Sequence, residues 1–120
     1  AENGQVRVRF RPTDMPPPLP PITLICGQLR PVHMQRLVRD AVTLGLSAIW
    51  FIPPQKGEAA YAKSDLYSPD NLRRLLIEGA AQAFDTLLPH IGISASLADA
   101  ISSLSPDCQR LALDNYEHTA

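Results

Sequence analysis

Two groups of polar side chains in this sequence could carry chemistry, and the first lies on one expected helix. Glu78 and Gln82 are four residues apart, which places them on the same helical face, and Asp85 follows closely. Side chains of this kind can orient a loop or a nucleic-acid strand at the rim of a domain. The same spacing is also typical of an ordinary solvated helix face, and the sequence leaves both interpretations open.

The second group consists of arginines. Arg7, Arg9 and Arg11 alternate with apolar residues, so an extended strand over residues 5–11 would have one basic face and one apolar face. Guanidinium groups gathered on a strand face or at a helix start can contact phosphates; solvated surface arginines are the alternative interpretation. Further arginines lie at or inside two expected helices: Arg30, Arg36, Arg39, Arg73 and Arg74.

Motifs for other chemistries are missing from the sequence. It contains no glycine-rich dinucleotide or P-loop motif, no HExxH and no GxSxG. His33, His90 and His118 have no spacing that would bring them to one metal ion. The serines cluster at expected helix ends, where capping is their usual role. Cys26 and Cys108 are far apart in the sequence and are expected to be reduced, inert thiols.

Composition limits the class of protein. The chain has 120 residues, of which 45% are hydrophobic, enough for one globular domain with a core. Eleven basic and twelve acidic residues give a net charge of −1, so any nucleic-acid site must be local. No apolar run approaches the roughly 20 residues of a membrane span, and no signal-peptide pattern occurs. We expect a cytoplasmic protein without a membrane partner and, because the sequence does not begin with Met, a piece of a longer polypeptide.

The elements that must position these groups begin with a βαβ unit. Residues 22–26 are apolar and rich in β-branched side chains, as is typical of a buried parallel strand. A helix is predicted between Pro31, typical of a first turn, and Gly45, typical of a helix end. Residues 47–52, which are followed by Pro53 and Pro54, form the second expected strand. The helix between the two strands gives a crossover of the length that parallel neighbours require. The apolar stripe of the helix recurs at three- and four-residue steps: Met34, Leu37, Val38, Ala41 and Leu44.

A second helix is predicted to start at a strong capping signal. Ser68 is a typical N-cap, and Pro69 and Asp70 favour the first turn that follows it. The apolar stripe predicts that this helix continues to about Thr86. Gly79 in its interior indicates close packing against a neighbouring element.

The remaining chain completes the expected fold. Residues 90–94, 97–104 and 109–114 are predicted to form a strand, a short helix and a last strand. The order predicts an α/β fold with a doubly wound parallel sheet. Ligands of such sheets bind outside the carboxyl ends of the strands. The proline-rich residues 13–21 predict a stiff linker at a domain junction, and an SH3-type ligand is the alternative.

Several stretches occur in the order and spacing of a known family. Residues 19–24 read Leu-Pro-Pro-Ile-Thr-Leu and residues 28–31 read Gln-Leu-Arg-Pro. Residues 76–83 read Leu-Ile-Glu-Gly-Ala-Ala-Gln-Ala and are followed by Asp-Thr-Leu-Leu-Pro at 85–89. Together they resemble the RsmE family of SPOUT-class methyltransferases, whose helix carries a Glu-x-x-x-Gln pattern. The resemblance covers residues 19 to 115.

The resemblance implies an enzyme that methylates N3 of a uridine in the 16S ribosomal RNA of the small subunit, with S-adenosylmethionine as cofactor, as a homodimer. It implies the end of a PUA-like RNA-binding β-barrel over residues 1–12, the linker over 13–21 and the first part of a SPOUT domain, which forms a trefoil knot, over 22–120. With the arginine pattern, it implies these RNA contacts: Arg7, Arg9, Arg11, Arg30, Glu78 and Gln82. The cofactor-facing loop would comprise Leu113, Asp114, Asn115 and Tyr116.

Part of the family pattern is missing from this chain. The glycine-rich loop that forms most of the cofactor site does not occur, and Asn115 stands where the family has Pro. We therefore expect the 120 residues alone to bind no S-adenosylmethionine and to transfer no methyl group. A non-catalytic RNA-binding module diverged from this family is the alternative. A receiver-like domain would need acidic residues after the first strand, where the sequence has Cys26-Gly27-Gln28.

Overall fold

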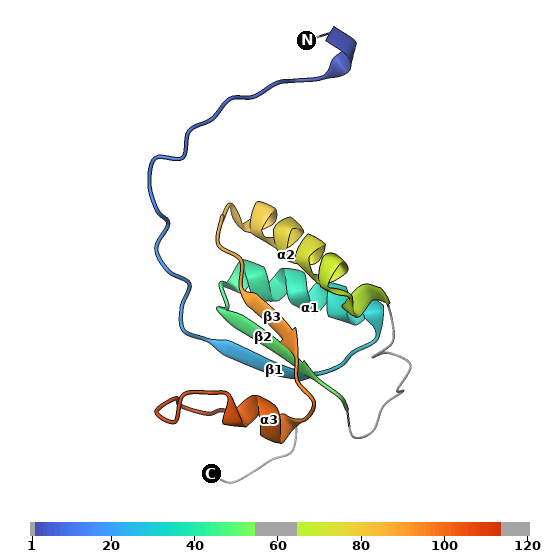
Figure 1. Ribbon diagram of the computed structural model, residues 1–120, viewed down its shortest axis with the longest axis vertical. Helices are drawn as coiled ribbons and strands as arrows, with labels where there is room; N and C mark the ends of the chain where they lie inside the picture. Colours follow the sequence, from blue (N-terminus) through green and yellow to red (C-terminus); the bar gives the residue numbers. More distant parts are fainter. Residues whose placement is uncertain (1, 55–64, 114–120) are drawn as a thin grey trace.

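The computed structural model describes residues 2–54 and 65–113, and a three-stranded parallel sheet forms the centre of the domain. Its elements are β1 (Thr23–Gly27), α1 (Pro31–Leu44), β2 (Ala48–Ile52), α2 (Pro69–Ala83), β3 (His90–Ile93) and α3 (Leu97–Ser102), with short 3-10 turns η1 (Glu2–Gly4) and η3 (Asp65–Tyr67). The strand order is β1-β2-β3. α1 and α2 cover one face of the sheet, and α3 lies on the other side (Figure 1). The predicted parallel α/β fold is confirmed.

The βαβ unit forms as predicted. β1 and β2 pair in parallel, with Thr23 opposite Ala48. α1 begins at Pro31 and ends before Gly45, whose φ of 82° is the left-handed conformation that favours glycine. One residue of the predicted buried stripe is not buried: Leu44, the last residue of α1, is 77% exposed.

The core lies between the middle strand and the two long helices. Ile49 and Phe51 of β2 are fully buried, and they point to the same face because side chains alternate along a strand. α1 and α2 cover this face with one buried stripe each, so the hydrophobic effect holds the helix layer on the sheet. The stripes consist of Met34, Val38, Ala41 and Val42 from α1 and Leu72, Leu75, Leu76 and Ala80 from α2.

α2 starts where the sequence predicts and ends earlier. The Ser68 hydroxyl accepts a hydrogen bond from the backbone N–H of Asn71 at 3.4 Å, as an N-cap does. The helix ends at Ala83 and not at Thr86, because Phe84 adopts a left-handed conformation with φ of 55°. The chain then turns at Asp85, whose carboxylate accepts from the two following backbone N–H groups at 2.7 and 3.1 Å.

Gly79 packs as closely as the sequence predicts. A Cβ atom at this position would lie 2.9 Å from Cβ of Val42 and 3.3 Å from the carbonyl oxygen of Arg39, both on α1. The absence of a side chain therefore allows α2 to approach α1 closely.

Two strand predictions are wrong. Residues 5–11 and residues 109–113 have no regular secondary structure, although both segments have strand-like sequences. A strand is stable only when another strand accepts its backbone hydrogen bonds, and none of the described residues provides that partner for either segment. Residue 114, the last of the second predicted strand, lies outside the described residues.

The N-terminal segment extends away from the sheet as an arm. Residues 2–22 leave the domain at the start of β1 and run along its side to a distant end (Figure 1). The molecule therefore measures 62 × 35 × 26 Å. Three apolar side chains toward the far end of the arm are largely exposed, at 82% for Val6, 72% for Val8 and 85% for Phe10.

Phe84 should destabilise the domain. Its ring is 98% exposed and its backbone is left-handed, a conformation that costs a non-glycine residue about 1–2 kcal/mol. We expect Phe84→Gly to raise the free energy of unfolding by about 1 kcal/mol, measured by urea denaturation. Phe84→Ala is the matched control, because it removes the ring and keeps the strained Cβ. A glycine variant no more stable than the alanine variant would contradict the prediction.

Candidate functional site

Open parallel α/β folds bind their ligands at the carboxyl edge of the sheet. The backbone N–H of Gln28 donates to the Ile52 carbonyl at 2.8 Å, and that of Ser94 donates to the Phe51 carbonyl at 2.8 Å. The ladder therefore continues one residue beyond β1 and β3. Gln28 is only 6% exposed, which makes it the one buried polar residue in the described part of the chain.

Tyr67 closes this edge from the turn η3. Its hydroxyl accepts a hydrogen bond from the backbone N–H of Leu29 and donates one to the Leu29 carbonyl, both at 2.8 Å. Its ring meets the ring of Phe51 edge-on, with centroids 5.2 Å apart. Burial raises the pKa of Tyr67, so the hydroxyl stays protonated and keeps its donor hydrogen. Sequence analysis missed Tyr67, because no local pattern reports a partner 38 residues away.

Glu78 joins the two long helices. Its Oε2 accepts from Arg39 of α1 at 2.9 Å from Nη2 and 3.2 Å from Nε, and its Oε1 accepts from Nη1 of Arg74 at 2.7 Å. The hydrogen bonds from Arg39, and then those from Arg74, hold the pKa of Glu78 below its ordinary value. Both carboxylate oxygens are thus engaged by protein groups. The arrangement supports a role in helix packing.

The other two members of this polar group do not join Glu78 in one cluster. Gln82 is exposed one turn further along α2, and Asp85 hydrogen-bonds to its own backbone neighbours. Because α2 ends where β3 begins, both residues lie toward the amino ends of the strands, away from the carboxyl edge (Figure 1).

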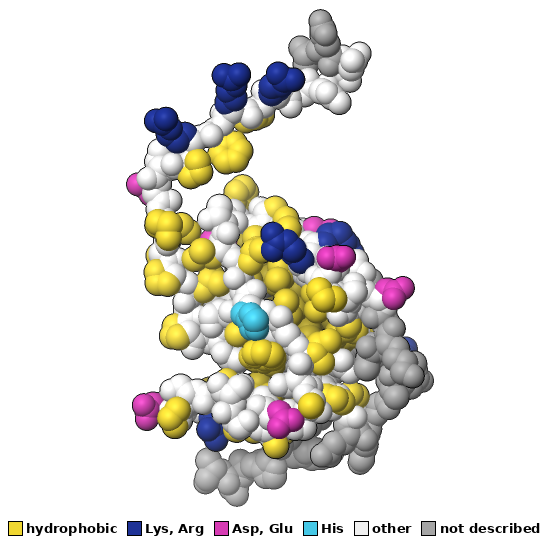
Figure 2. All heavy atoms as spheres, viewed as in Figure 1, with side chains coloured by type: hydrophobic (Ala, Val, Ile, Leu, Met, Phe, Trp, Pro, Cys, Tyr) yellow, Lys and Arg dark blue, Asp and Glu magenta, His cyan; other side chains and the backbone are white. Residues whose placement is uncertain are grey.

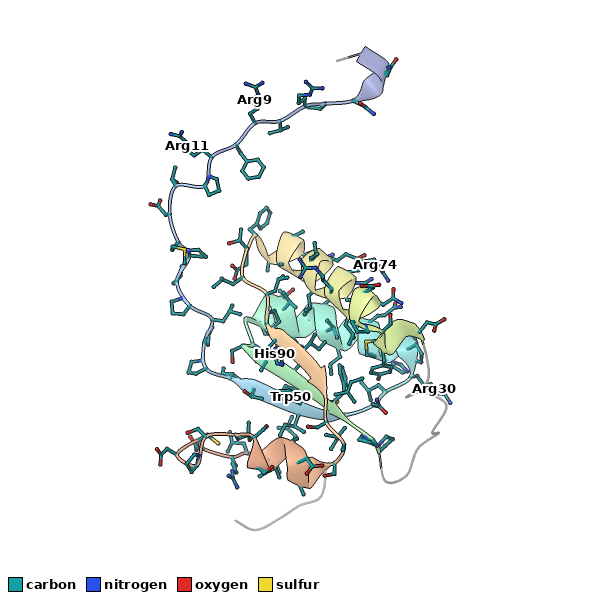
Figure 3. All side chains as sticks on the ribbon, viewed as in Figure 1. Arg9, Arg11, Arg30, Trp50, Arg74 and His90 are labelled. Carbon is teal, nitrogen blue, oxygen red and sulfur yellow. The ribbon has the colours of Figure 1, made fainter. Side chains whose placement is uncertain are left out.

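The predicted RNA-contacting arginines occupy two separate places. The arm presents its basic side chains on one side and its apolar side chains on the other (Figure 2). Arg9 and Arg11 lie on this arm, and Arg30 lies at the start of α1 on the opposite side of the domain (Figure 3). The structure therefore does not bring Arg7, Arg9 and Arg11 together with Arg30.

The predicted cofactor-facing loop is described at one position. Leu113 is fully exposed, and Asp114, Asn115 and Tyr116 lie outside the described residues. The segment 109–113 runs beside β1 and α3, and a groove of about 530 Å³ separates it from the strand. The side chains that line this groove are aliphatic, apart from Thr23, Gln109 and Arg110.

The remaining reactive groups form no further centre. Within residues 2–54 and 65–113, no three His, Cys, Asp or Glu side chains are placed to share a metal ion. Cys26 is half-buried and burial raises its thiol pKa, while Cys108 is exposed; both are free thiols. The rings of Trp50 and His90 meet at a tilt of 55° with centroids 5.0 Å apart (Figure 3). None of the helices in the described ranges is long and apolar enough to cross a membrane.

Comparison with known sequences gives a family. A model of the RNA methyltransferase domain matches residues 16–120. The chain is 36% identical over 77 residues to Ribosomal RNA small subunit methyltransferase E of Treponema pallidum, a match that covers 64% of this chain and 29% of that protein. It is 25% identical over 84 residues to Ribosomal RNA small subunit methyltransferase E 1 of Borreliella burgdorferi, covering 70% and 35% respectively. The chain spans about a third of the length of these curated relatives.

Solved structures share the fold. A probable rRNA-methyltransferase from Porphyromonas gingivalis superposes with a TM-score of 0.60 at 16% identity, covering 78% of this chain and 38% of that one. A second structure, of a hypothetical protein, has a TM-score of 0.53 at 14% identity and covers 72% and 44%. At these identities the likeness supports the α/β architecture alone.

The parallel sheet and the family match together define the class of protein. The chain belongs to the RNA methyltransferase domain family. Within that family, the curated matches confirm the resemblance to RsmE over 64–70% of the chain.

The Glu78 ion pairs predict a pH-dependent contribution to stability. Because the folded-state pKa is lowered, the contribution is present above the ordinary glutamate pKa and is lost as pH falls through the lowered value. We expect Glu78→Gln to lower the free energy of unfolding at neutral pH, with the difference from the unsubstituted chain shrinking in acid. Urea denaturation of the variant and of the unsubstituted chain, from neutral to acid pH, measures this difference in the free energy of unfolding.

The control for this variant is Asp40→Asn. The Arg36–Asp40 pair is 3.8 Å apart with side chains 85% and 68% exposed, so its loss should change stability little. A Glu78→Gln deficit that stays constant down to acid pH would contradict the assignment.

Proposed function

We propose that this chain is the first part of the methyltransferase domain of an RsmE-like enzyme that uses S-adenosylmethionine to methylate N3 of a uridine in 16S ribosomal RNA. The family match over residues 16–120 carries the proposal. The relatives are named ribosomal RNA small subunit methyltransferases, and these names support the choice of substrate. A cytoplasmic homodimer with a SPOUT trefoil knot is part of the same proposal, by resemblance to the family.

The proposed division of the chain follows from the same family. Residues 1–12 would end a PUA-like RNA-binding barrel, 13–21 would be the linker and 22–120 would begin the SPOUT domain. Two observations support this division: residues 5–22 before β1 have no helix or strand and expose Val6, Val8 and Phe10, and the family match begins at residue 16. A barrel would supply the strand partners that residues 5–11 lack among the described residues.

The described residues near the proposed cofactor loop do not fit S-adenosylmethionine. Leu113 is fully exposed, and the groove beside β1 contains no carboxylate that could accept the ribose hydroxyls or the ammonium group of this cofactor. Arg110 on the groove wall would repel the positively charged sulfonium. We therefore derive no catalytic step through the cofactor for these 120 residues.

What these residues contribute to the proposed reaction is RNA positioning. Methylation of uridine N3 requires the base to be deprotonated or polarised and held in line with the methyl group, so much of the catalysis is orientation. Arginine guanidinium groups suit this task because they grip phosphates with a fixed geometry. The proposed RNA contacts are Arg7, Arg9 and Arg11 on the arm, Arg30 at the carboxyl edge, and Gln82 and Glu78 on α2. Glu78 is the weakest of these candidates, because Arg39 and Arg74 already engage both its carboxylate oxygens.

A non-catalytic RNA-binding module is the second candidate function. RNA contacts through the arm and Arg30 need no cofactor, so the same described residues serve either candidate. The two candidates differ in one observable property of the complete protein: an enzyme transfers a methyl group to 16S ribosomal RNA, and a binding module does not.

The arm should contact RNA phosphates. We expect the triple variant Arg7→Ala, Arg9→Ala, Arg11→Ala to weaken binding to a 16S ribosomal RNA transcript and to flatten its salt dependence. Each lost phosphate contact should lower the slope of log K against log salt by about 0.7–0.9. Arg36→Ala is the control, because that exposed arginine pairs with Asp40 on α1 and lies outside the proposed contacts. An unchanged slope in the triple variant would remove the arm from the interface.

The 120 residues alone should not bind the methyl donor. Calorimetric titration of the chain with S-adenosylmethionine is expected to give no heat of binding, because the groove lacks partners for the polar groups of the cofactor. Binding with a dissociation constant in the micromolar range would show that residues 114–120 and their surroundings complete a site.

A further inference from the structure

Tyr67 makes a two-way hydrogen bond to a single residue of the loop that follows β1. Its hydroxyl satisfies both backbone polar groups of Leu29, the N–H and the carbonyl, at 2.8 Å each. One side chain thus supplies the two hydrogen bonds that a neighbouring strand would otherwise supply. The loop is held at a point where the ladder between β1 and β2 has already ended at Gln28.

Tyr67 is itself firmly held. It is 4% exposed, and its ring packs edge-on against Phe51, which is fully buried in β2. The turn that carries it is tied to the start of α2, because the Asp65 carbonyl accepts from the side-chain amide of Asn71 at 2.6 Å and from the backbone N–H of Ser68 at 3.0 Å. The hydroxyl therefore transmits the position of β2 and α2 to the loop after β1.

The residue next to Leu29 is Arg30, whose backbone is fixed on the other side as well. Arg30 is the N-cap residue of α1, and its carbonyl accepts from the N–H groups of His33 and Met34 at 3.0 and 2.9 Å. Pro31 follows with a ring-restricted φ. The arginine side chain thus leaves a backbone that is held before and after it, at the carboxyl edge of the sheet (Figure 3).

We propose that Tyr67 is a positioning residue that fixes Arg30 for contact with a phosphate of the RNA substrate. The inference rests on the proposed function and adds a residue to it. A guanidinium on a fixed backbone loses less conformational freedom on binding than one on a mobile loop, and this preorganisation raises affinity without any new contact. Tyr67 does not touch the RNA in this arrangement.

The test compares Tyr67→Phe, Arg30→Ala and the double variant in the full chain, with a 16S ribosomal RNA transcript as the ligand. Loss of the hydroxyl removes two hydrogen bonds and keeps the ring on Phe51. We expect it to weaken RNA binding about three- to tenfold. Arg30→Ala should weaken binding at least as much. The double variant should bind no more weakly than Arg30→Ala alone, because Tyr67 acts through Arg30.

Ser68→Ala is the matched control for a general loss of stability. It removes the N-cap of α2 one residue away from Tyr67 and leaves both hydrogen bonds to Leu29 in place. Its RNA affinity should stay within twofold of the unsubstituted chain. Hydrogen exchange of the Leu29 amide gives a second readout that needs no binding: it should be slow in the unsubstituted chain and in Ser68→Ala, and faster in Tyr67→Phe.

The outcomes separate this inference from the proposed function. If Arg30→Ala leaves RNA binding unchanged, the proposed Arg30 contact is wrong and the inference fails with it. If Arg30→Ala weakens binding while Tyr67→Phe does not, the contact stands and the positioning role is wrong. Additive losses in the double variant, an equal loss in Ser68→Ala, or rapid exchange of the Leu29 amide in the unsubstituted chain would each overturn the inference.

Discussion

The burial of β2 between two parallel neighbours is the constraint on which the rest of the structure depends. Ile49 and Phe51 have no exposed surface, and every other element is placed relative to this strand. β1 and β3 pair with its two edges, α1 and α2 cover its inner face, and Tyr67 packs against its Phe51. Parallel pairing brings the carboxyl ends of the strands to one edge, where Gln28 and Ser94 lie on either side of β2.

Two polar contacts complete the packing around β2, one at the carboxyl edge of the sheet and one between the two long helices. At the carboxyl edge, the hydroxyl of Tyr67 fixes the loop that leads into α1. On the outer side, Glu78 of α2 pairs with Arg39 of α1. The next residue, Gly79, has no side chain and allows the two helices to approach closely. The first contact holds the backbone next to Arg30, and the second pairs Arg39 and Arg74 with one carboxylate. The packing around β2 thus fixes the backbone from which these basic side chains extend.

Local sequence signals predicted the elements whose causes are local. Pro31, Gly45 and the Ser68 cap placed helix ends correctly, because capping depends on a few neighbouring residues. The strands predicted at 5–11 and 109–113 are absent because pairing depends on a partner elsewhere, which alternation does not report. The contacts Tyr67–Leu29 and Arg39–Glu78 join residues 38 and 39 positions apart, beyond any local pattern. Glu78 and Gln82 share a helix face as predicted, but α1 engages only the former.

Magnetic resonance of the isotopically labelled chain in solution tests the central claim most directly, through cross-strand proton contacts around β2. In the structure, Ile25 lies opposite Trp50 and Ile49 lies opposite Ile91, both in parallel register. The account predicts contacts between these neighbours in the pattern of parallel strands on both sides of β2. An antiparallel pattern, or a β2 with a solvent-exposed edge, would contradict the fold.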